Sequence, residues 1–352
     1  MRSRNKTISL LFSILILLPF ILGYAPLQTK TIRAWVAHWD AQNSLDYFKN
    51  NFPDKIDELN LFFYCLDKDG NVVNAIVEEE EYVQVIKSLR DLKTDISVTI
   101  TNDVIYSKTV RTLKDPDIIH RILNDEVLRK RHIQQITNIA NGINAAGVDI
   151  NYEKIYIEDK NKFSQFIKEL SFVLHSQNKA LSVTVHQKTK DHQRSGPGAI
   201  DWKEISGYAD QIIIMCYNYS SKASKPGPNC PPFWLGEIIK FAKSQIASEK
   251  ICIALGLYGY DWSDESVNSV NFSKVVDLLK QYPAVLKWDN KSQTPYFKYS
   301  QGSVQHEVWF ENQRSIAKKI ELIKKYDIDH IAIWHLGIMD ASLFEPIESF
   351  LE

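Results

Sequence analysis

Eight short runs rich in Val, Ile and other apolar residues recur along the chain, and amphipathic segments separate most of them. The segments EEEYVQVIKSLRDL and KNKFSQFIKELSFVLHSQ, for example, repeat apolar residues at the three- and four-residue spacing of a helix with one buried face. Strands that alternate with helices pair in parallel, and eight such units close into a (β/α)8 barrel, the TIM barrel. The pattern therefore predicts this α/β fold. The expected strands span residues 32–39, 59–66, 95–101, 147–153, 180–187, 210–218, 250–258 and 329–337.

One interval between expected strands is too long for a single helical connection. Residues 259–311 contain the helix-like stretch SKVVDLLKQY and the strand-like stretches PYFKYS and HEVWF. We predict a small α+β insertion there, after the seventh strand, within a barrel domain that spans residues 31–352. A chain of 352 residues, of which 44% are hydrophobic, is long enough for one barrel with such an insertion.

Residues 1–25 have the plan of a secretory signal peptide. Arg2 and Arg4 precede the apolar run ISLLFSILILLPFILGY, and small residues surround a cleavage point after Ala25. The run is also long enough for an uncleaved membrane anchor, although Pro19 favours cleavage. We therefore expect a secreted, periplasmic or cell-envelope protein that contacts a membrane only if this segment stays attached.

The charge balance and the cysteine spacing argue against two classes of partner. The chain carries 42 basic and 43 acidic residues, and no basic stripe predicts a nucleic-acid partner. Cys65, Cys216, Cys230 and Cys252 lack the Cys-x-x-Cys or Cys/His spacing of a zinc site, and three of them lie inside apolar runs. We therefore expect buried free thiols and no metal at these positions.

The expected fourth strand, GVDINYE, carries Asp149, Asn151 and Glu153 at alternate positions. Alternate side chains of a strand share one face, so these three polar groups point one way while Val148 and Ile150 point the other. On an exposed edge strand such a polar face would simply meet water. In a closed barrel the fourth strand has no exposed edge, and its carboxyl end lies where barrel enzymes place their active sites. The sequence thus favours an active site over a solvated edge.

Aromatic and amide residues follow several of the other expected strands. Aromatic rings around carboxylates suit a sugar, because the rings stack on the pyranose face while the carboxylates transfer protons. Each aromatic residue on its own is also compatible with core packing, most strongly so for Tyr258 and Trp262. The residues expected to gather at the barrel mouth and contact a substrate are Trp39, Tyr217, Asn218, Tyr258, Tyr260, Trp262 and Trp334.

Histidines near strand ends permit a second hypothesis, a metal-dependent hydrolase. Its ligands would be His38, His186 and His335 together with Asp149. The first strand lacks a His-x-His pair, however, and the three histidines differ in their position relative to the alternation of their strands. A lone histidine at a strand end is more often a structural or substrate-contacting group, so we expect neither a metal nor another cofactor.

Four motifs in the right order carry a resemblance to glycoside hydrolase family 18. GVDINYE resembles that family's fourth-strand signature DxxDxDxE, and MCYNY resembles its sixth-strand Met-x-Tyr-Asp or Met-x-Tyr-Asn. LGLYGYDW resembles the seventh-strand turn, and IAIWHLG the eighth-strand Trp. The segment from His306 to Gly337 is similar to the C-terminal part of bacterial spore-cortex and cell-wall N-acetylglucosaminidases within the family. The resemblance extends from about Ile32 to the C-terminus.

The resemblance implies a retaining glycosidase in which the substrate assists its own cleavage, a known exception to the two-carboxylate scheme. Glu153 matches the general acid and Asp149 the inner acid of the signature. Tyr217 matches the residue whose hydroxyl steadies the 2-acetamido group, and Trp334 the floor beneath the sugar. The implied substrates are β-1,4-linked glycans that contain N-acetylglucosamine, such as chitooligosaccharides or peptidoglycan, with N-glycan cores as a further candidate.

Two positions depart from the family signature. Its first Asp is Ala146 here, and the Asp two residues before the acid is Asn151. An amide can accept a hydrogen bond from the acetamido N–H but brings no charge, so a catalytically silent, lectin-like sugar-binding barrel is the alternative function. Such relatives typically lose the acid, and the presence of Glu153 favours an enzyme. We expect burial and the charge of Asp149 to raise the pKa of Glu153, as a general acid requires.

Overall fold

The computed structural model describes residues 29–76, 78–90, 92–107 and 109–352, so the expected signal peptide lies outside the described residues. In this part of the chain, eight parallel strands close into a barrel, with β1 next to β15 at the point of closure. The predicted TIM barrel is confirmed. In their order around the barrel the strands are β1 (Thr31–Ala37), β2 (Glu58–Asp67), β4 (Asp95–Ile105), β6 (Gly147–Asn151), β7 (Ala180–His186), β8 (Gln211–Met215), β9 (Ile251–Gly256) and β15 (His330–Trp334).

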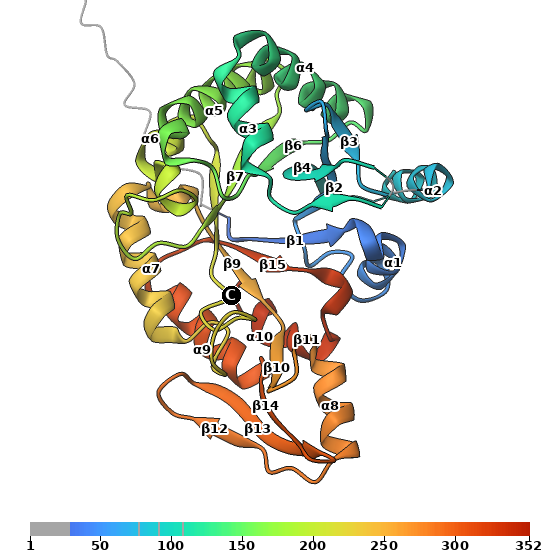
Figure 1. Cartoon of the computed structure of the whole chain (residues 1–352), viewed down its shortest axis with the longest axis vertical. Helices are drawn as coiled ribbons and strands as arrows, with labels where there is room; N and C mark the ends of the chain where they lie inside the picture. Colours follow the sequence, from blue (N-terminus) through green and yellow to red (C-terminus); the bar gives the residue numbers. More distant parts are fainter. Residues whose placement is uncertain (1–28, 77, 91, 108) are drawn as a thin grey trace, which may run out of the picture.

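Helices surround the barrel (Figure 1), and each buries apolar side chains in one cluster with the apolar residues of the strands. In α5 the buried residues Phe163, Ile167, Leu170 and Leu174 recur at three- and four-residue intervals, which is the spacing of one helical face. The helices of this layer are α1 (Ala41–Asn51), α2 (Glu79–Leu89), α3 (Pro116–Asn124), α4 (Glu126–Gly142), α5 (Lys160–His175), α6 (Trp202–Ser206), α7 (Pro232–Gln245), α9 (Gln313–Lys325) and α10 (Glu345–Glu348).

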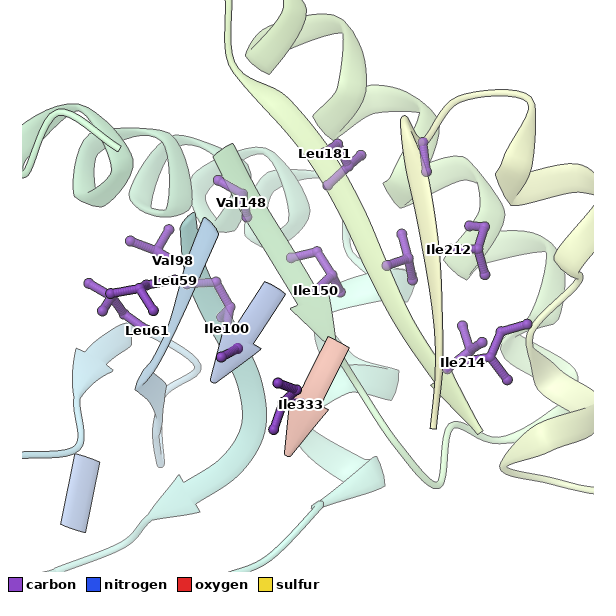
Figure 2. Close-up of a cluster of buried hydrophobic side chains, with 14 of the residues drawn as sticks. Leu59, Leu61, Val98, Ile100, Val148, Ile150, Leu181, Ile212, Ile214 and Ile333 are labelled. Atoms are coloured by element: carbon purple, nitrogen blue, oxygen red, sulfur yellow. The ribbon is translucent and has the colours of Figure 1, made fainter. Parts of the chain in front are cut away.

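Strand β6 is central, with β4 on one side and β7 on the other. Val148 and Ile150 belong to the apolar layer between strands and helices, where they lie beside Leu181 and other aliphatic side chains of neighbouring strands (Figure 2). Asp149 has the opposite orientation and is buried inside the barrel. The alternation expected for GVDINYE is therefore present, and the edge-strand alternative is wrong.

The long interval after β9 forms a separate antiparallel sheet, which lies at the lower edge of Figure 1. Its strand order is β11, β10, β14, β13, β12, and helix α8 (Phe272–Gln281) packs against it through Val275 and Leu278. This is the α+β insertion that the sequence predicts within 259–311. Its strands are β10 (Gly259–Ser263), β11 (Val267–Val270), β12 (Lys287–Asp289), β13 (Thr294–Gln301) and β14 (Val304–Trp309).

Two short strands extend the barrel at its mouth. β3 (Val72–Asn74) pairs antiparallel with β2, and β5 (Arg111–Thr112) pairs antiparallel with the end of β4. Strand β4 continues to Ile105, four residues past its expected end, because it forms this hairpin. The hairpin places Asp103 and Lys114 beside the barrel mouth, and the backbone N–H of Lys114 donates to Oδ1 of Asp103 at 2.9 Å.

The four cysteines lie within the described residues, and all of them are buried and unpaired, as expected. None of the helices in the described ranges combines the length and the apolar composition needed to cross a membrane.

Candidate active site

A cavity of about 400 Å³ opens at the carboxyl ends of the barrel strands, where barrel enzymes bind their substrates. Seven of the ten residues expected at the site from the sequence line it, while Asp149 is buried in the barrel, Tyr260 lines a neighbouring hollow and Trp262 is buried in the core. The seven are Trp39, Asn151, Glu153, Tyr217, Asn218, Tyr258 and Trp334. Lining residues that the sequence reasoning did not assign to this site are Phe62, Asp103, Leu113, Lys114, His186, Gln187 and Met215.

Asp149 is enclosed by hydrogen-bond donors from three other strands. Thr184 and Ser182 donate to Oδ1 at 2.8 and 3.3 Å, while Thr99 and the indole N–H of Trp35 donate to Oδ2 at 3.0 and 3.4 Å. Burial raises the pKa of Asp149 to about 6, although the hydrogen bonds from Thr184, Thr99 and Trp35 act in the opposite direction. This carboxyl group therefore changes its protonation state near neutral pH.

Asn151 presents an unused acceptor. Its side chain is 3% exposed, and Oδ1 has no hydrogen-bond partner among the described residues. A buried polar atom without a partner ordinarily costs about 1–3 kcal/mol. A ligand N–H that reached Oδ1 would remove that cost, so the cavity wall favours a ligand with an amide donor at this point.

The backbone of Glu153 is fixed by Asn102, a buried residue of β4. Asn102 donates to the carbonyl of Glu153 at 2.9 Å and accepts from its N–H at 3.0 Å. The carboxylate then lies between two basic side chains. Nε2 of His186 is 2.9 Å from Oε2, and Nζ of Lys114 is 3.3 Å from Oε1.

These neighbours reverse the pKa shift expected for Glu153. Burial on its own would raise the pKa, but the contact with His186 and the positive charge of Lys114 together lower it to about 2. The expectation of a raised pKa is therefore wrong for the free protein. The two basic groups that reverse the shift belong to other segments of the chain and lie outside the local pattern of GVDINYE.

Tyrosine and asparagine side chains form the wall on the side of β8 and β9. The Asn218 backbone is left-handed, with φ +63°, and its N–H donates to Oδ1 of Asn229 at 2.7 Å. Oδ1 of Asn218 accepts from the hydroxyls of Tyr258 and Tyr260 at 2.8 and 2.7 Å. Burial, followed by the negative charge of Glu153, raises the pKa of Tyr217 far above its ordinary value. The Tyr217 hydroxyl thus stays protonated and can donate a hydrogen bond.

Indole rings form the adjoining wall, at the ends of β15 and β1. Trp334 is flanked edge-on by Trp35, Phe62 and Trp39 at centroid distances of 5.8, 5.1 and 6.3 Å. Trp39 remains 56% exposed, which leaves most of one ring free to contact a ligand. Trp262 does not line the cavity, and its buried ring packs beside Tyr260 in the core instead.

The histidines and Asp149 do not form a metal site. His186 contacts Glu153, and His335 packs edge-on against Trp39 at 5.5 Å. His38 lines a neighbouring hollow instead of the main cavity. Within the described ranges no group of three or more His, Cys, Asp or Glu side chains could hold a metal ion.

The family model for glycosyl hydrolases family 18 matches residues 32–339. This chain belongs to glycosyl hydrolase family 18. Family membership makes the chain a glycosidase, and it accounts for the barrel fold. The resemblance found in the sequence motifs is confirmed.

Known family-18 proteins resemble the chain in sequence and in fold. The cortical fragment-lytic enzyme of Bacillus anthracis is 28% identical over 230 residues, which are 63% of this chain and 53% of that enzyme, so the match spans about half the relative's length. The spore cortex-lytic enzyme SleL of Bacillus cereus has a TM-score of 0.80 at 24% identity, over 91% of this chain and 74% of that one. A chitinase of Chromobacterium violaceum has a TM-score of 0.81 at 21% identity, over 92% of this chain and 99% of the chitinase chain. These two structures share the fold.

Proposed function

We propose that this family-18 chain is an exported glycosidase that cleaves β-1,4 linkages in glycans containing N-acetylglucosamine, by substrate-assisted retaining catalysis. The observation that carries the proposal is the presence, in one cavity, of the Glu153 carboxylate and the unpartnered carbonyl of Asn151. A proton-transfer group and an acceptor for an amide N–H suit a sugar with a 2-acetamido group. The aromatic wall suits the pyranose ring.

In the proposed reaction, Glu153 protonates the glycosidic oxygen, and the bond between that oxygen and the anomeric carbon breaks. The carbonyl oxygen of the sugar's own 2-acetamido group bonds to the anomeric carbon from the opposite face and gives an oxazolinium ion. The Glu153 carboxylate then removes a proton from water, and the water oxygen displaces the acetamido oxygen. Two inversions retain the anomeric configuration, and the substrate replaces the second carboxylate of the common scheme.

The remaining residues orient the acetamido group and the sugars. Oδ1 of Asn151 accepts from the acetamido N–H, and the Tyr217 hydroxyl donates to the acetamido carbonyl. Trp334 forms the floor beneath the reacting sugar. Trp39, Asn218 and Tyr258 contact neighbouring sugar units, and Asp149 supports the strand position of Asn151 from inside the barrel.

A second hollow, of about 470 Å³, continues from the cavity towards the insertion and shares Trp39, Tyr258 and Trp334 with it. Its described lining includes Lys222 and Lys274 and no carboxylate. Two cations without an acidic neighbour in this lining favour an anionic glycan, so peptidoglycan, whose stem peptides carry carboxylates, is preferred over neutral chitin. The relative from Bacillus anthracis is named a cortical fragment-lytic enzyme, which agrees with peptidoglycan as the preferred substrate.

One observation favours the alternative of a catalytically silent sugar-binding barrel. The two basic groups beside Glu153 keep its carboxyl ionised, and Asn151 carries no charge. A protein with these features could bind an N-acetylated glycan in the cavity without cleaving it.

Comparison of wild-type protein with Glu153→Gln separates the two functions. The substrates are a fluorogenic chitooligosaccharide and solubilised peptidoglycan, with products identified by mass spectrometry and binding measured by calorimetry. We expect Glu153→Gln to lose roughly two to four orders of magnitude in turnover while it binds oligosaccharide nearly as well as wild type. Glu158→Gln makes the same chemical change at an exposed position five residues later and serves as the control.

Two results would contradict the proposed function. A Glu153→Gln variant that kept more than a tenth of wild-type turnover would remove Glu153 from the role of acid. Wild-type protein that bound both glycans without cleaving either would show that the chain is a sugar-binding protein.

A further inference from the structure

Glu153 lies in a row of four ionisable side chains that come from different segments of the chain. Oδ1 of Asp103 is 3.5 Å from Nζ of Lys114, which is 3.3 Å from Oε1 of Glu153, and Oε2 of Glu153 is 2.9 Å from Nε2 of His186. The four side chains are only 16–28% exposed. Charges this close with little water between them interact strongly.

This row creates a problem for acid catalysis. With a pKa of about 2, fewer than about one Glu153 carboxyl in a thousand carries a proton near neutral pH. Asp149 could hold a proton, but its oxygens face Thr99, Thr184, Ser182 and Trp35 inside the barrel. In the family signature the residue between the two acids is a carboxylic acid. The amide of Asn151 replaces it here and cannot pass an acidic proton along the strand.

We propose that His186 is a positioning residue that holds the proton of the His186–Glu153 pair and passes it to Glu153 during the reaction; this rests on the proposed role of Glu153. The proton moves from Nε2 of His186 to Oε2 of Glu153 and leaves its electron pair on the nitrogen. Glu153 gives the proton to the glycosidic oxygen. In the second half of the reaction Glu153 takes a proton from water and returns it to His186, so the pair ends as it began.

The surroundings of His186 agree with this role. Imidazole is the side chain that ordinarily exchanges a proton in the neutral range. The His186 side chain is 28% exposed, so it can recover a proton from water between turnovers. Besides Glu153, the ionisable groups that line the same cavity are Asp103, Lys114, Tyr217 and Tyr258. The nearest basic group on its own segment, Lys188, donates to the carbonyl of Ile200 at 2.8 Å instead.

The pH dependence of kcat/KM tests the proposal with two variants that have opposite expected effects. His186→Gln removes the proton carrier, so the decline of kcat/KM on the alkaline side of the pH profile should begin at lower pH. At pH 7 kcat/KM should fall about tenfold or more, and at pH 5 the loss should be smaller. Lys114→Met removes a cation that favours the Glu153 carboxylate, so the proton resides on Glu153 more often and the alkaline limb moves to higher pH.

His175→Gln is the matched control, because His175 makes the same kind of contact, Nε2 to Oδ2 of Asp210 at 2.9 Å, on an exposed surface of α5. It should leave the profile unchanged. A His186→Gln variant with unchanged or higher kcat/KM at pH 7 would overturn the proposal. An equal loss at every pH would overturn it as well, because that result indicates a purely structural role.

NMR of the His186 imidazole decides the pairing without any turnover. The Nε2–H resonance of His186 should differ between wild-type protein and Glu153→Gln, because Nε2 lies 2.9 Å from Oε2 of Glu153. Identical resonances would overturn the pairing. If wild-type protein cleaves neither glycan, the proposed function fails, while this measurement still shows whether the two side chains are paired.

Discussion

Nζ of Lys114 lies 3.3 Å from Oε1 of Glu153, although 39 positions separate the two residues in the chain. Lys114 reaches this position because it follows the β4–β5 hairpin in a left-handed conformation, with φ +57°, and extends over the ring of Phe62 at 5.1 Å. The acid just after β6 therefore takes its charged neighbours from other segments, whereas Asn151, the last residue of β6, is neutral.

We expect Trp39→Ala to weaken substrate binding more than stability. The ring is 56% exposed and borders both the main cavity and the hollow towards the insertion. Loss of a sugar-stacking ring should raise KM about fivefold, equivalent to ~1 kcal/mol, with kcat nearly unchanged. Phe172→Ala removes a 63% exposed ring from α5, away from the cavity, and serves as the control. Equal KM values for wild type and Trp39→Ala would show that no sugar reaches this ring.

A buried ion pair anchors α9 to the end of the insertion. Nζ of Lys319 lies 2.6 Å from Oε2 of Glu311, and the two side chains are 3% and 1% exposed. Removal of one partner leaves a buried charge uncompensated, so Lys319→Met should lower the free energy of unfolding by about 3–5 kcal/mol. The measurement is urea unfolding followed by tryptophan fluorescence.

The preceding residue supplies the control for this ion pair. Lys318 contacts Glu321 at 2.8 Å, but the two side chains are 41% and 63% exposed. Exposed pairs contribute about 0–1 kcal/mol, so Lys318→Met should have little effect. The double variant Lys319→Met with Glu311→Gln should recover part of the loss, because it removes the unpaired charge. Similar losses for Lys318→Met and Lys319→Met would contradict the argument from burial.

The raised pKa of Asp149 should make stability depend on pH. Unfolded aspartate ionises near pH 4, whereas burial holds the folded pKa at about 6, so the folded chain binds an extra proton between these values. The free energy of unfolding therefore falls as pH rises through this window, by about 2 kcal/mol between pH 4 and pH 7.5 from this residue. The change is lost in Asp149→Asn.

Urea unfolding at pH 4 and pH 7.5 measures this effect. Relative to wild type, the free energy of unfolding of Asp149→Asn should be higher at pH 7.5 than at pH 4. Asp264→Asn, at an exposed position in the insertion, is the control. Its free energy of unfolding should differ from that of wild type by the same amount at pH 4 and at pH 7.5. A difference for Asp149→Asn that did not vary with pH would mean that the carboxyl stays in one protonation state.

The barrel could be predicted from the sequence because each strand leaves a local signal. The expected strand 210–218, for instance, contains β8, and 329–337 contains β15. Alternation within GVDINYE also indicated which side chains face inwards, before any neighbour was known. These signals depend only on residues close together in the chain, so one sequence is enough to detect them.

The electrostatic partners of Glu153 could not be predicted in the same way. The partners depend on where the β4–β5 hairpin folds over the barrel mouth. The residues around Lys114 have neither a strand-like nor a helix-like periodicity that would indicate the position of this hairpin. The sequence marks His186 as a strand-end residue, either a metal ligand or a structural or substrate-contacting group, but does not indicate that it pairs with Glu153. The sign of the pKa shift of Glu153 followed from these two positions, so the sequence reasoning predicted the opposite direction.

Export remains a prediction that lies outside the described residues. If residues 1–25 form a cleaved signal peptide, N-terminal sequencing of secreted or periplasmic protein should begin near Pro26. Material that begins at Met1 and fractionates with membranes would indicate the anchor alternative instead. Replacement of Ala25 with a bulky residue should block cleavage and is the matched test of the site.

Asn151→Asp should increase kcat, but only at acidic pH. The new carboxylate would lie where the unpartnered Oδ1 now is, and a charge-assisted hydrogen bond to the acetamido N–H is about twice as strong as a neutral one. Because the developing charge of the transition state is positive, a gain of ~1.4 kcal/mol, or about tenfold in kcat, is expected. Above about pH 6 Asp149 ionises as well, and adjacent carboxylates resist ionising together.

The gain should therefore be present at pH 5 and largely absent at pH 7.5, so that the pH optimum of Asn151→Asp lies below that of wild type. Asn138→Asp, at an exposed position on α4, makes the same substitution away from the cavity and should leave rate and pH profile unchanged. If Asn151→Asp also leaves both unchanged, Oδ1 of Asn151 does not contact the reacting sugar. The alignment of β6 with the family signature would then give this residue the wrong role, because a charge placed beside an oxazolinium ion cannot be without effect.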